Sequence, residues 1–335
     1  MRLVAAVVAL LYNCACLFVR ASVPPDFRAY VKKYGLHPRR TEFGEQLSRK
    51  EYTTNVYFIR LFNHDTVKLK ENVKTGMVPI GDLMGNILGV RKPRLARRLS
   101  DLPFDASNVP TPAFWNDIAF DWRDVVEFPK IKHQKPNECF AETAAIALDA
   151  LYQNLYPSNK VAFFNPDLLL KCAGHSLGET GLPDEIYSVH RLFSPTAGCH
   201  ATRKFERKMT LHQPVVFCDL WGDTRIEQKI MSMLKIAPVA VGIESTNRVF
   251  RNYKSGILSP HHIRSRGGVV DHAVSVVGFG RADKPPYDKY WTIRNSWGED
   301  WGENGYARVQ RFSEPGDSAK GVFNAYAAVV GASKV

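Results

Sequence analysis

A cysteine at the start of an apolar helix is the first residue in this chain whose position favours chemistry. Cys139 follows the loop 135–138, which contains a proline, and it opens the Ala-rich segment that runs to Leu155. Proline cannot continue a helix backwards, so the pattern predicts a helix that begins at this thiol. Unpaired N–H groups and the positive end of the helix dipole favour a thiolate there. Cys139 is therefore a candidate nucleophile, the alternative being a small buried apolar residue.

Two residues further along could complete a site around that thiol. His272 opens a strand-like run that ends at Gly280, and Asn295 follows another such run, just before an aromatic, Gly-rich turn. Catalysis by a thiolate needs a base that shares the ion pair and a group that orients the imidazole. Cys139, His272 and Asn295 supply these roles in that order. We therefore predict a nucleophilic site with a thiolate–imidazolium pair.

The elements that would position these residues change in character along the chain. Residues 26–70 show a helical period, and residues 73–105 are Gly-containing, basic and without a sustained period, which is typical of an extended segment. From Asp121 onward, a helix over 140–155 precedes strand-like runs at 238–243, 272–279, 290–294 and 306–309. Early helices and late strands within one block predict the α+β class.

Composition and charge narrow the classes of function. The 335 residues are 45% apolar and 23% charged, as in a folded protein of about two domains. Residues 22–107 hold 16 Lys and Arg against 9 Asp and Glu, so +7 of the net charge of +12 lies in the N-terminal third. The basic excess is not spread over one folded face, and we expect no nucleic-acid partner.

The first residues resemble a targeting segment. The apolar stretch 3–19 follows Arg2 and leads into the small-x-small pattern Val19-Arg20-Ala21, which predicts a secretory signal peptide over 1–21, with an uncleaved anchor as the alternative. We expect passage through the secretory pathway and no stable membrane anchor. The basic run 91–98 is interpreted either as a solvated linker or as a protease-sensitive joint.

Cysteine use is sparse for a secreted protein. After removal of the signal, four cysteines remain, namely Cys139, Cys172, Cys199 and Cys218. They are compatible with one or two disulfides, or with one disulfide and thiols kept for chemistry. Close C-x-x-C spacing is absent from the sequence, and the adjacent His261 and His262 lack a nearby thiol or carboxylate cluster. We interpret these histidines as part of a surface loop, and we expect neither a metal nor a cofactor.

Taken together, these motifs resemble those of the papain-like cysteine peptidases. The long run from Asn295 to Tyr306, with the pattern Asn-Ser-Trp-Gly-x-x-Trp-Gly-x-x-Gly-Tyr, is too extended to arise by chance. Other segments that carry the resemblance are Asp121-Trp122-Arg123 at the start of the mature enzyme, Lys132-His133-Gln134, Cys139 and Asp271-His272-Ala273.

The resemblance implies a fold and a set of roles. The fold would be papain-like, with a helical left domain, a β-barrel-like right domain and a cleft between them, spanning residues 116–335. Gln134 and the Cys139 N–H would bind the oxyanion. Trp297 would shield the contact between histidine and asparagine, and Gly181 and Leu182 would lie beside the substrate. By the same resemblance, Cys172 would pair with Cys199, or alternatively with Cys218.

The N-terminal region resembles a cathepsin-L-type propeptide, which would span 22–115. Tyr52, Asn55, Ile59 and Asn63 fit the spacing of the propeptide helix, and the segment 76–82 resembles the turn that follows it. The match is partial, because Val78 and Ile80 replace the usual Asn and Phe. The propeptide would act as an intramolecular inhibitor of a zymogen.

The sequence departs from the family around the nucleophile. The loop before Cys139 is one residue shorter than usual and lacks the first of the family's two cysteines, while Phe140 replaces a tryptophan. Glu138 places an anion beside the thiol, where it would raise the thiol pKa if it pointed inward. The stretch 178–182 also lacks the cysteine that would pair with the missing one, and both halves of a second family disulfide are missing as well.

Two functions are compatible with these residues. The first is a cysteine endopeptidase that is secreted or lysosomal (or vacuolar), made as a zymogen, acting on protein or peptide substrates and open to cystatin-like inhibitors. The second is a catalytically impaired papain-fold protein that serves as a binding module, which the shortened loop, Glu138 and Leu182 favour. The presence of Gln134, Cys139, His272 and Asn295 together favours the peptidase.

Overall fold

The computed structural model describes residues 27–34, 52–64, 73–76, 119–157, 162–200, 207–218, 226–263, 270–283, 289–311, 323 and 326–335. Contacts between Cα atoms divide the chain into two compact units, residues 1–62 and 63–335. The predicted signal peptide, the basic run 91–98 and the predicted boundary between residues 115 and 116 lie outside the described residues.

The first unit contains the helices that the sequence predicts near the N-terminus. Helix α2 spans Phe27–Tyr34, and a second helix spans 52–64, of which the last two residues are assigned to the second unit. Tyr52, Val56 and Ile59 are buried on one face of the second helix, at steps of three and four residues. The Tyr52 ring packs on Phe27 and Tyr30, with ring centroids 5.4 and 4.9 Å apart. The helical period predicted here is therefore confirmed for the described residues.

In the second unit, a short piece of the predicted propeptide joins the main body. Strand β1, Lys74–Thr75, pairs antiparallel with β7, Tyr253–Ser255, and the Gly76 N–H donates to the Asn252 carbonyl at 2.8 Å. Asn63 holds this strand, because its amide N donates to the Thr75 carbonyl and its Oδ1 accepts from the Thr75 N–H, both at 2.8 Å. Residues 78, 80 and 82 of the predicted turn lie outside the described residues.

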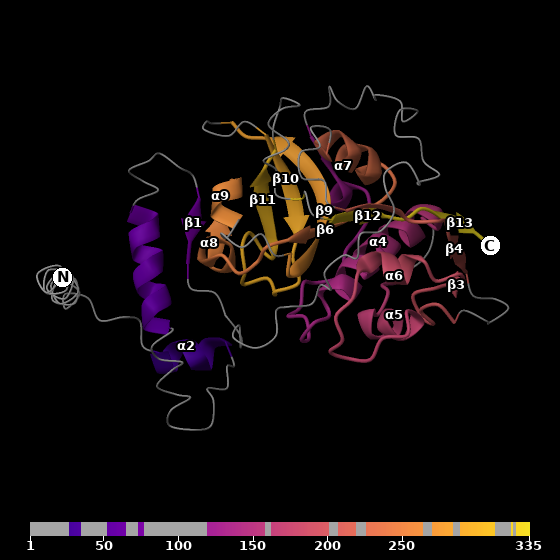
Figure 1. The fold of residues 1–335 in the computed structure, drawn as a ribbon, viewed down its shortest axis with the longest axis horizontal. Helices are drawn as coiled ribbons and strands as arrows, with labels where there is room; N and C mark the ends of the chain where they lie inside the picture. The colour runs from indigo at the N-terminus through magenta and orange to yellow at the C-terminus, as the bar shows by residue number, and fades with distance from the viewer. Residues whose placement is uncertain are drawn as a thin grey trace, which may run out of the picture. The chain divides into compact units, whose positions relative to one another are not determined.

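Three helices form one layer beside the sheet (Figure 1). They are α4, Cys139–Leu155, α5, Pro166–Cys172, and α6, Pro183–Tyr187. Helix α4 is buried along most of its length and contacts α5, α6 and the central strand β9, His272–Arg281. Helix α5 begins where Asn165 accepts a hydrogen bond from the Asp167 N–H at 2.9 Å, with a proline in its first turn.

The sheet layer is built around β9. Its strand order is β5-β12-β6-β9-β10-β11-β8, with β2 paired to β9. The bounds are Phe120–Asp121 for β2, Val215–Cys218 for β5, Val239–Ile243 for β6, Ile257–Leu258 for β8, Lys289–Arg294 for β10, Tyr306–Gln310 for β11 and Tyr326–Val329 for β12. All of these pairs are antiparallel except β11 with β8. The predicted strands are therefore present.

Smaller elements complete the unit. Strands β3, Leu192–Phe193, β4, Met209–Leu211, and β13, Ala332–Lys334, form a three-stranded sheet. The helices are η4, Trp122–Asp124, α7, Ile226–Leu234, α8, Arg248–Arg251, and α9, Pro260–Ile263. Within the described part of the chain, no helix is both long and apolar enough to cross a bilayer. The α+β class predicted from the sequence is confirmed.

One expectation about the histidine pair is wrong. His262 is not on the surface, since it is 3% exposed within α9 and its Nδ1 lies 3.2 Å from both the N–H and the hydroxyl of Ser259. Hydrogen bonds to Ser259, the residue just before α9, hold this buried ring, and the polar sequence of the segment conceals it.

Candidate active site

The nucleophile candidate is the first residue of α4. Cys139 is fully buried, and backbone N–H groups of Ala273, Phe140 and Cys139 itself face its sulfur. These N–H groups favour the thiolate, but removal from water outweighs them and raises the pKa of Cys139 to about 12. The expected low thiol pKa is therefore wrong for the described state. The negative charge that adds to the increase is Asp271 rather than Glu138.

The base candidate is the first residue of β9. His272 Nε2 lies 2.7 Å from Asn295 Oδ1, and the same oxygen accepts a hydrogen bond from the Ser296 N–H at 2.8 Å. Because that oxygen is an acceptor for both, His272 carries its proton on Nε2 in the neutral form. Nδ1 is buried and has no hydrogen-bond partner among the described residues. It therefore presents a lone pair that can take up a proton.

An indole covers this contact. The Trp297 ring stacks on the His272 ring with centroids 4.9 Å apart and planes 23° from parallel. Phe250 and Trp301 hold the indole in turn, with ring centroids 5.4 and 5.7 Å from it. Burial lowers the pKa of His272 to about 4, although its hydrogen bond to Asn295 acts in the opposite direction. The imidazole is therefore neutral above about pH 4.

Strand register brings the base to the nucleophile. His272 pairs with Ile243 of β6, and the preceding Asp271 donates its N–H to the Ile243 carbonyl at 3.1 Å. The Asp271 carboxylate accepts from the Ser245 N–H at 2.7 Å, which fixes the entry into β9. Since the Ala273 N–H faces the Cys139 sulfur, the thiol lies against the residue next to His272. Helix and strand thus meet at the two candidate groups.

The loop that carries Gln134 is held against the loop that carries Asn295. Gln134 donates its N–H to the Ser296 carbonyl at 2.8 Å, and the Gly298 N–H donates to the Lys132 carbonyl at 3.2 Å. Ser296 Oγ donates to Gln134 Oε1 at 2.5 Å, and the amide nitrogen donates to the Lys135 carbonyl at 3.4 Å, which leaves its second hydrogen for a ligand. Gly298 has φ +79°, and a Cβ there would meet the His133 ring at 2.6 Å, so this approach requires glycine.

The two predicted substrate residues lie at the start of α6. Gly181 is buried, and a Cβ at this position would come within 2.6 Å of the Phe140 ring. Leu182 has an extended backbone, is 9% exposed, and donates its N–H to Glu185 Oε2 at 3.3 Å. The sequence did not single out Glu185 or His175, which contact this stretch. Only the missing cysteine, whose place in the family pattern is taken by Glu179, indicated that another contact must stabilise the loop.

A cavity of about 460 Å³ is lined by Asn295, by two carboxyl groups of α4 and by Glu138, which directly precedes that helix. Glu138, Glu142 and Asp149 share one face of the helix, at steps of four and seven residues. Burial is the main cause that raises their pKa values, to about 7 for Glu142. Glu138 Oε1 and Asp149 Oδ2 are buried without a hydrogen-bond partner among the described residues. Glu142 is therefore largely protonated below about pH 7.

A disulfide joins Cys172 to Cys199, the pairing that the resemblance implies. Together with His200 these sulfurs form the single group of His, Cys, Asp and Glu atoms at metal-like spacing in the described part of the chain. Both sulfurs are used in the disulfide, so this group is not a plausible ligand set. The side chain of Cys218 lies outside those that the structure describes.

Comparison with known proteins identifies the family of this chain. The family model described as papain family cysteine protease matches residues 117–325. The chain belongs to the papain family. That match includes Cys139, His272, Asn295 and Gln134, and it leaves out the N-terminal helices.

Relatives of this papain-family chain come from distant organisms. It is 31% identical over 201 residues to a viral cathepsin of Heliothis zea nuclear polyhedrosis virus, covering 57% of this chain and 52% of the relative. It is 29% identical over 225 residues to the senescence-specific cysteine protease SAG12 of Arabidopsis thaliana, covering 62% and 60%. The chain thus spans little more than half the length of these two relatives.

Solved zymogens share the fold. A digestive procathepsin L 3 of Tenebrio molitor larval midgut superimposes with a TM-score of 0.66 at 19% identity, covering 90% of this chain and 96% of that one. A recombinant stem bromelain precursor gives 0.67 at 19% identity, covering 91% and 97%. At this identity the likeness establishes the papain-like fold alone.

Proposed function

We propose that this protein is a cysteine endopeptidase in which Cys139 is the nucleophile, His272 the base and Asn295 the group that orients it. The observation that carries the proposal is the arrangement of the imidazole. Asn295 binds Nε2, Trp297 covers one face, and the unpartnered Nδ1 remains on a ring whose neighbour, Ala273, faces the thiol.

The mechanism follows from these positions. His272 Nδ1 takes the proton of the Cys139 thiol as the sulfur attacks the scissile carbonyl, which forms a C–S bond and an oxyanion. The Gln134 amide and the Cys139 N–H donate to that oxyanion. The imidazolium then protonates the leaving amine, which breaks the C–N bond and leaves an acyl-enzyme. A water molecule, deprotonated by His272, hydrolyses the thioester and restores the thiol.

The pKa values of Cys139 and His272 determine under which conditions the two groups form a thiolate–imidazolium pair. With the thiol pKa near 12 and the imidazole pKa near 4, both groups are neutral in the described state. Burial disfavours each ion alone, whereas an ion pair formed by proton transfer within the site stabilises both charges. We infer that the transfer accompanies substrate binding or follows the admission of water to the site.

The N-terminal segment is the proposed inhibitor. Its described part already pairs with the enzyme, since β1 adds to β7 and Asn63 binds Thr75 on both backbone groups. A segment anchored in this way and continuing to Phe120 is long enough to cover the site. Its removal between about residues 91 and 116, in an acidic or extracellular compartment, would produce the active enzyme.

Hydrolysis of a peptide by the processed chain tests this proposal. The wild type should turn over a fluorogenic peptide, Cys139→Ala should abolish turnover while the protein remains folded, and Cys218→Ala should retain it. The full-length chain should be slower than the processed chain at the same pH. Activity that persists in Cys139→Ala would overturn the proposal. A folded, processed wild type without activity would instead favour the binding module suggested by the altered nucleophile loop.

A further inference from the structure

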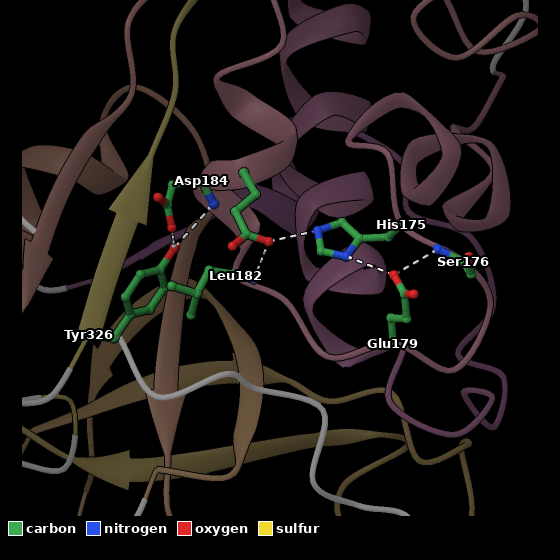
Figure 2. Close-up of polar contacts among 7 residues, drawn as sticks. His175, Ser176, Glu179, Leu182, Asp184 and Tyr326 are labelled. Atoms are coloured by element: carbon green, nitrogen blue, oxygen red, sulfur yellow. Dashed lines mark hydrogen bonds and ion pairs between the residues drawn. The ribbon is translucent and has the colours of Figure 1, made fainter. Parts of the chain in front are cut away.

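A cluster of charged side chains lies between the nucleophile helix and the start of α6. His175 follows α5, and its side chain is only 9% exposed. Its Nε2 lies 2.7 Å from Glu185 Oε2, and its Nδ1 lies 3.5 Å from Glu179 Oε2. Figure 2 shows the His175 ring with a dashed contact from each nitrogen, one of them to Glu179. Both ring nitrogens therefore face an acceptor.

Each carboxylate also binds the backbone. Glu179 Oε2 accepts from the Ser176 N–H at 3.0 Å, and Glu185 Oε2 accepts from the Leu182 N–H at 3.3 Å. The far end of this stretch is attached to the sheet, because Tyr326 of β12 donates its hydroxyl to Asp184 Oδ1 at 2.6 Å. Figure 2 shows these contacts on either side of Leu182. The loop is thus held at both ends by side chains.

The same imidazole packs on the residue after the nucleophile. The His175 and Phe140 rings are 5.3 Å apart at 70°, and Phe140 is fully buried. Gly181 also lies close to both Phe140 and Glu185. A Cβ at this position would come within 2.6 Å of the Phe140 ring and 2.9 Å of Glu185 Oε2. The backbone at 181 therefore fits between the nucleophile helix and the carboxylate that binds His175.

A second polar link runs in parallel. Asn137, two residues before the nucleophile, donates its side-chain amide to the Gly178 carbonyl at 2.7 Å. By the family pattern a disulfide would join these two loops, but neither cysteine is present in this chain. Hydrogen bonds from Asn137 and His175 occupy the place of that covalent link.

We propose that His175, through Glu185 and Glu179, is the positioning residue that holds the substrate-facing edge at Gly181 and Leu182 against the nucleophile helix. This role rests on the proposed peptidase function. His175 touches neither the reacting atoms nor, in this proposal, the substrate. It acts by fixing the backbone with which an extended peptide pairs, so its loss should weaken substrate binding more than the chemical step.

The test compares a reagent that needs this edge with one that does not. A peptidyl epoxide must align along residues 181 and 182, whereas iodoacetamide alkylates Cys139 without pairing to the backbone. His175→Ala should raise KM about tenfold and slow epoxide labelling by a similar factor, because a part-buried hydrogen bond to a carboxylate is lost. The values of kcat and of the alkylation rate should stay within about twofold of the wild type.

Matched variants sharpen the result. His175→Gln should recover part of the loss, since its amide can still donate to Glu185. Glu179→Gln should have a smaller effect than Glu185→Gln, because the Glu179 side chain is 54% exposed and its contact is 3.5 Å long. His190→Ala, at an exposed histidine just after α6, should change neither rate.

Three outcomes would contradict the proposal. If His175→Ala leaves both KM and epoxide labelling unchanged, the residue does not position the edge. If it slows the epoxide and iodoacetamide equally, it supports the nucleophile or the fold rather than the substrate edge. A processed wild type that reacts with neither reagent would overturn the proposed function itself, and this role with it.

Discussion

The two halves of the site are held in place by different kinds of interaction. The half that carries His272 and Asn295 is fixed by strand pairing among β6, β9 and β10 and by the stacked Trp297. The half that carries Cys139 is fixed by side chains, among them the ion pair between Lys135 and Asp167 at 2.6 Å and the contact from Asn137. Backbone pairing tolerates substitution, whereas the nucleophile half depends on a few polar residues.

The largest expected loss of activity follows substitution of the residues in the half of the site that the sheet holds. His272→Ala should lower kcat of the processed enzyme by about four orders of magnitude, because no other group takes the thiol proton. Asn295→Ala should cost about a hundredfold, since the imidazole loses the acceptor that fixes its tautomer. Initial rates at substrate saturation measure both. Equal losses for the two variants would show that Asn295 does more than orient the ring.

The buried carboxyls on α4 should make stability depend on pH. Burial raises the pKa of Glu142 from its usual 4.5 to about 7, so the folded chain binds more protons than the unfolded chain between these values. Stability should therefore fall as pH rises from about 4.5 to 7, by at most about 3 kcal/mol for this group. Glu142→Gln should flatten this dependence in urea unfolding of the full chain.

Two controls bear on that pH dependence. Glu127→Gln changes an exposed carboxyl and should leave the slope unchanged. A Glu142→Gln variant with the same loss of stability between pH 4.5 and 7 as the wild type would show that Glu142 is not the group responsible. Asp149, which is fully buried and has a raised pKa, would then be the next residue to replace.

Asn137 contributes to stability in two ways that can be measured separately, and each effect is smaller than those above. This residue has φ +64° and also donates to Gly178. Asn137→Gly keeps the backbone conformation and removes the hydrogen bond, at a cost of about 1 kcal/mol. Asn137→Ala also strains the backbone and should cost about 1 kcal/mol more. Thermal unfolding of the two variants gives the difference. Identical stabilities would mean that the conformation at 137 is not a constraint.

The smallest predicted effect concerns selectivity. The sequence places Leu182 where a side chain narrows the approach of substrate, and the structure buries it at the start of α6. We expect the wild type to be slow on Phe-Arg and Leu-Arg reporters, and Leu182→Gly to raise kcat/KM a few fold, because glycine lets another backbone come close. An unchanged kcat/KM would show that Leu182 does not line the substrate channel.

Much of this arrangement was predictable from the sequence, because its causes are local. Alternating and apolar runs gave the strands around His272, and a proline before Cys139 marked the start of α4. The thiol pKa was predicted in the wrong direction, since the helix terminus was visible in the sequence but the complete burial of Cys139 was not. His175 and Glu185 were missed for the same reason, because their contacts depend on how distant loops pack.

The central claim is that Cys139 reacts only through its partnership with His272 and only when the N-terminal segment is gone. Mass spectrometry of the chain after treatment with a peptidyl epoxide tests this most directly. The account predicts one adduct, on Cys139, in the processed wild type, and essentially none in the full-length chain or in processed His272→Ala. Equal labelling of Cys139 in all three, or an adduct on another residue of the processed wild type, would contradict it.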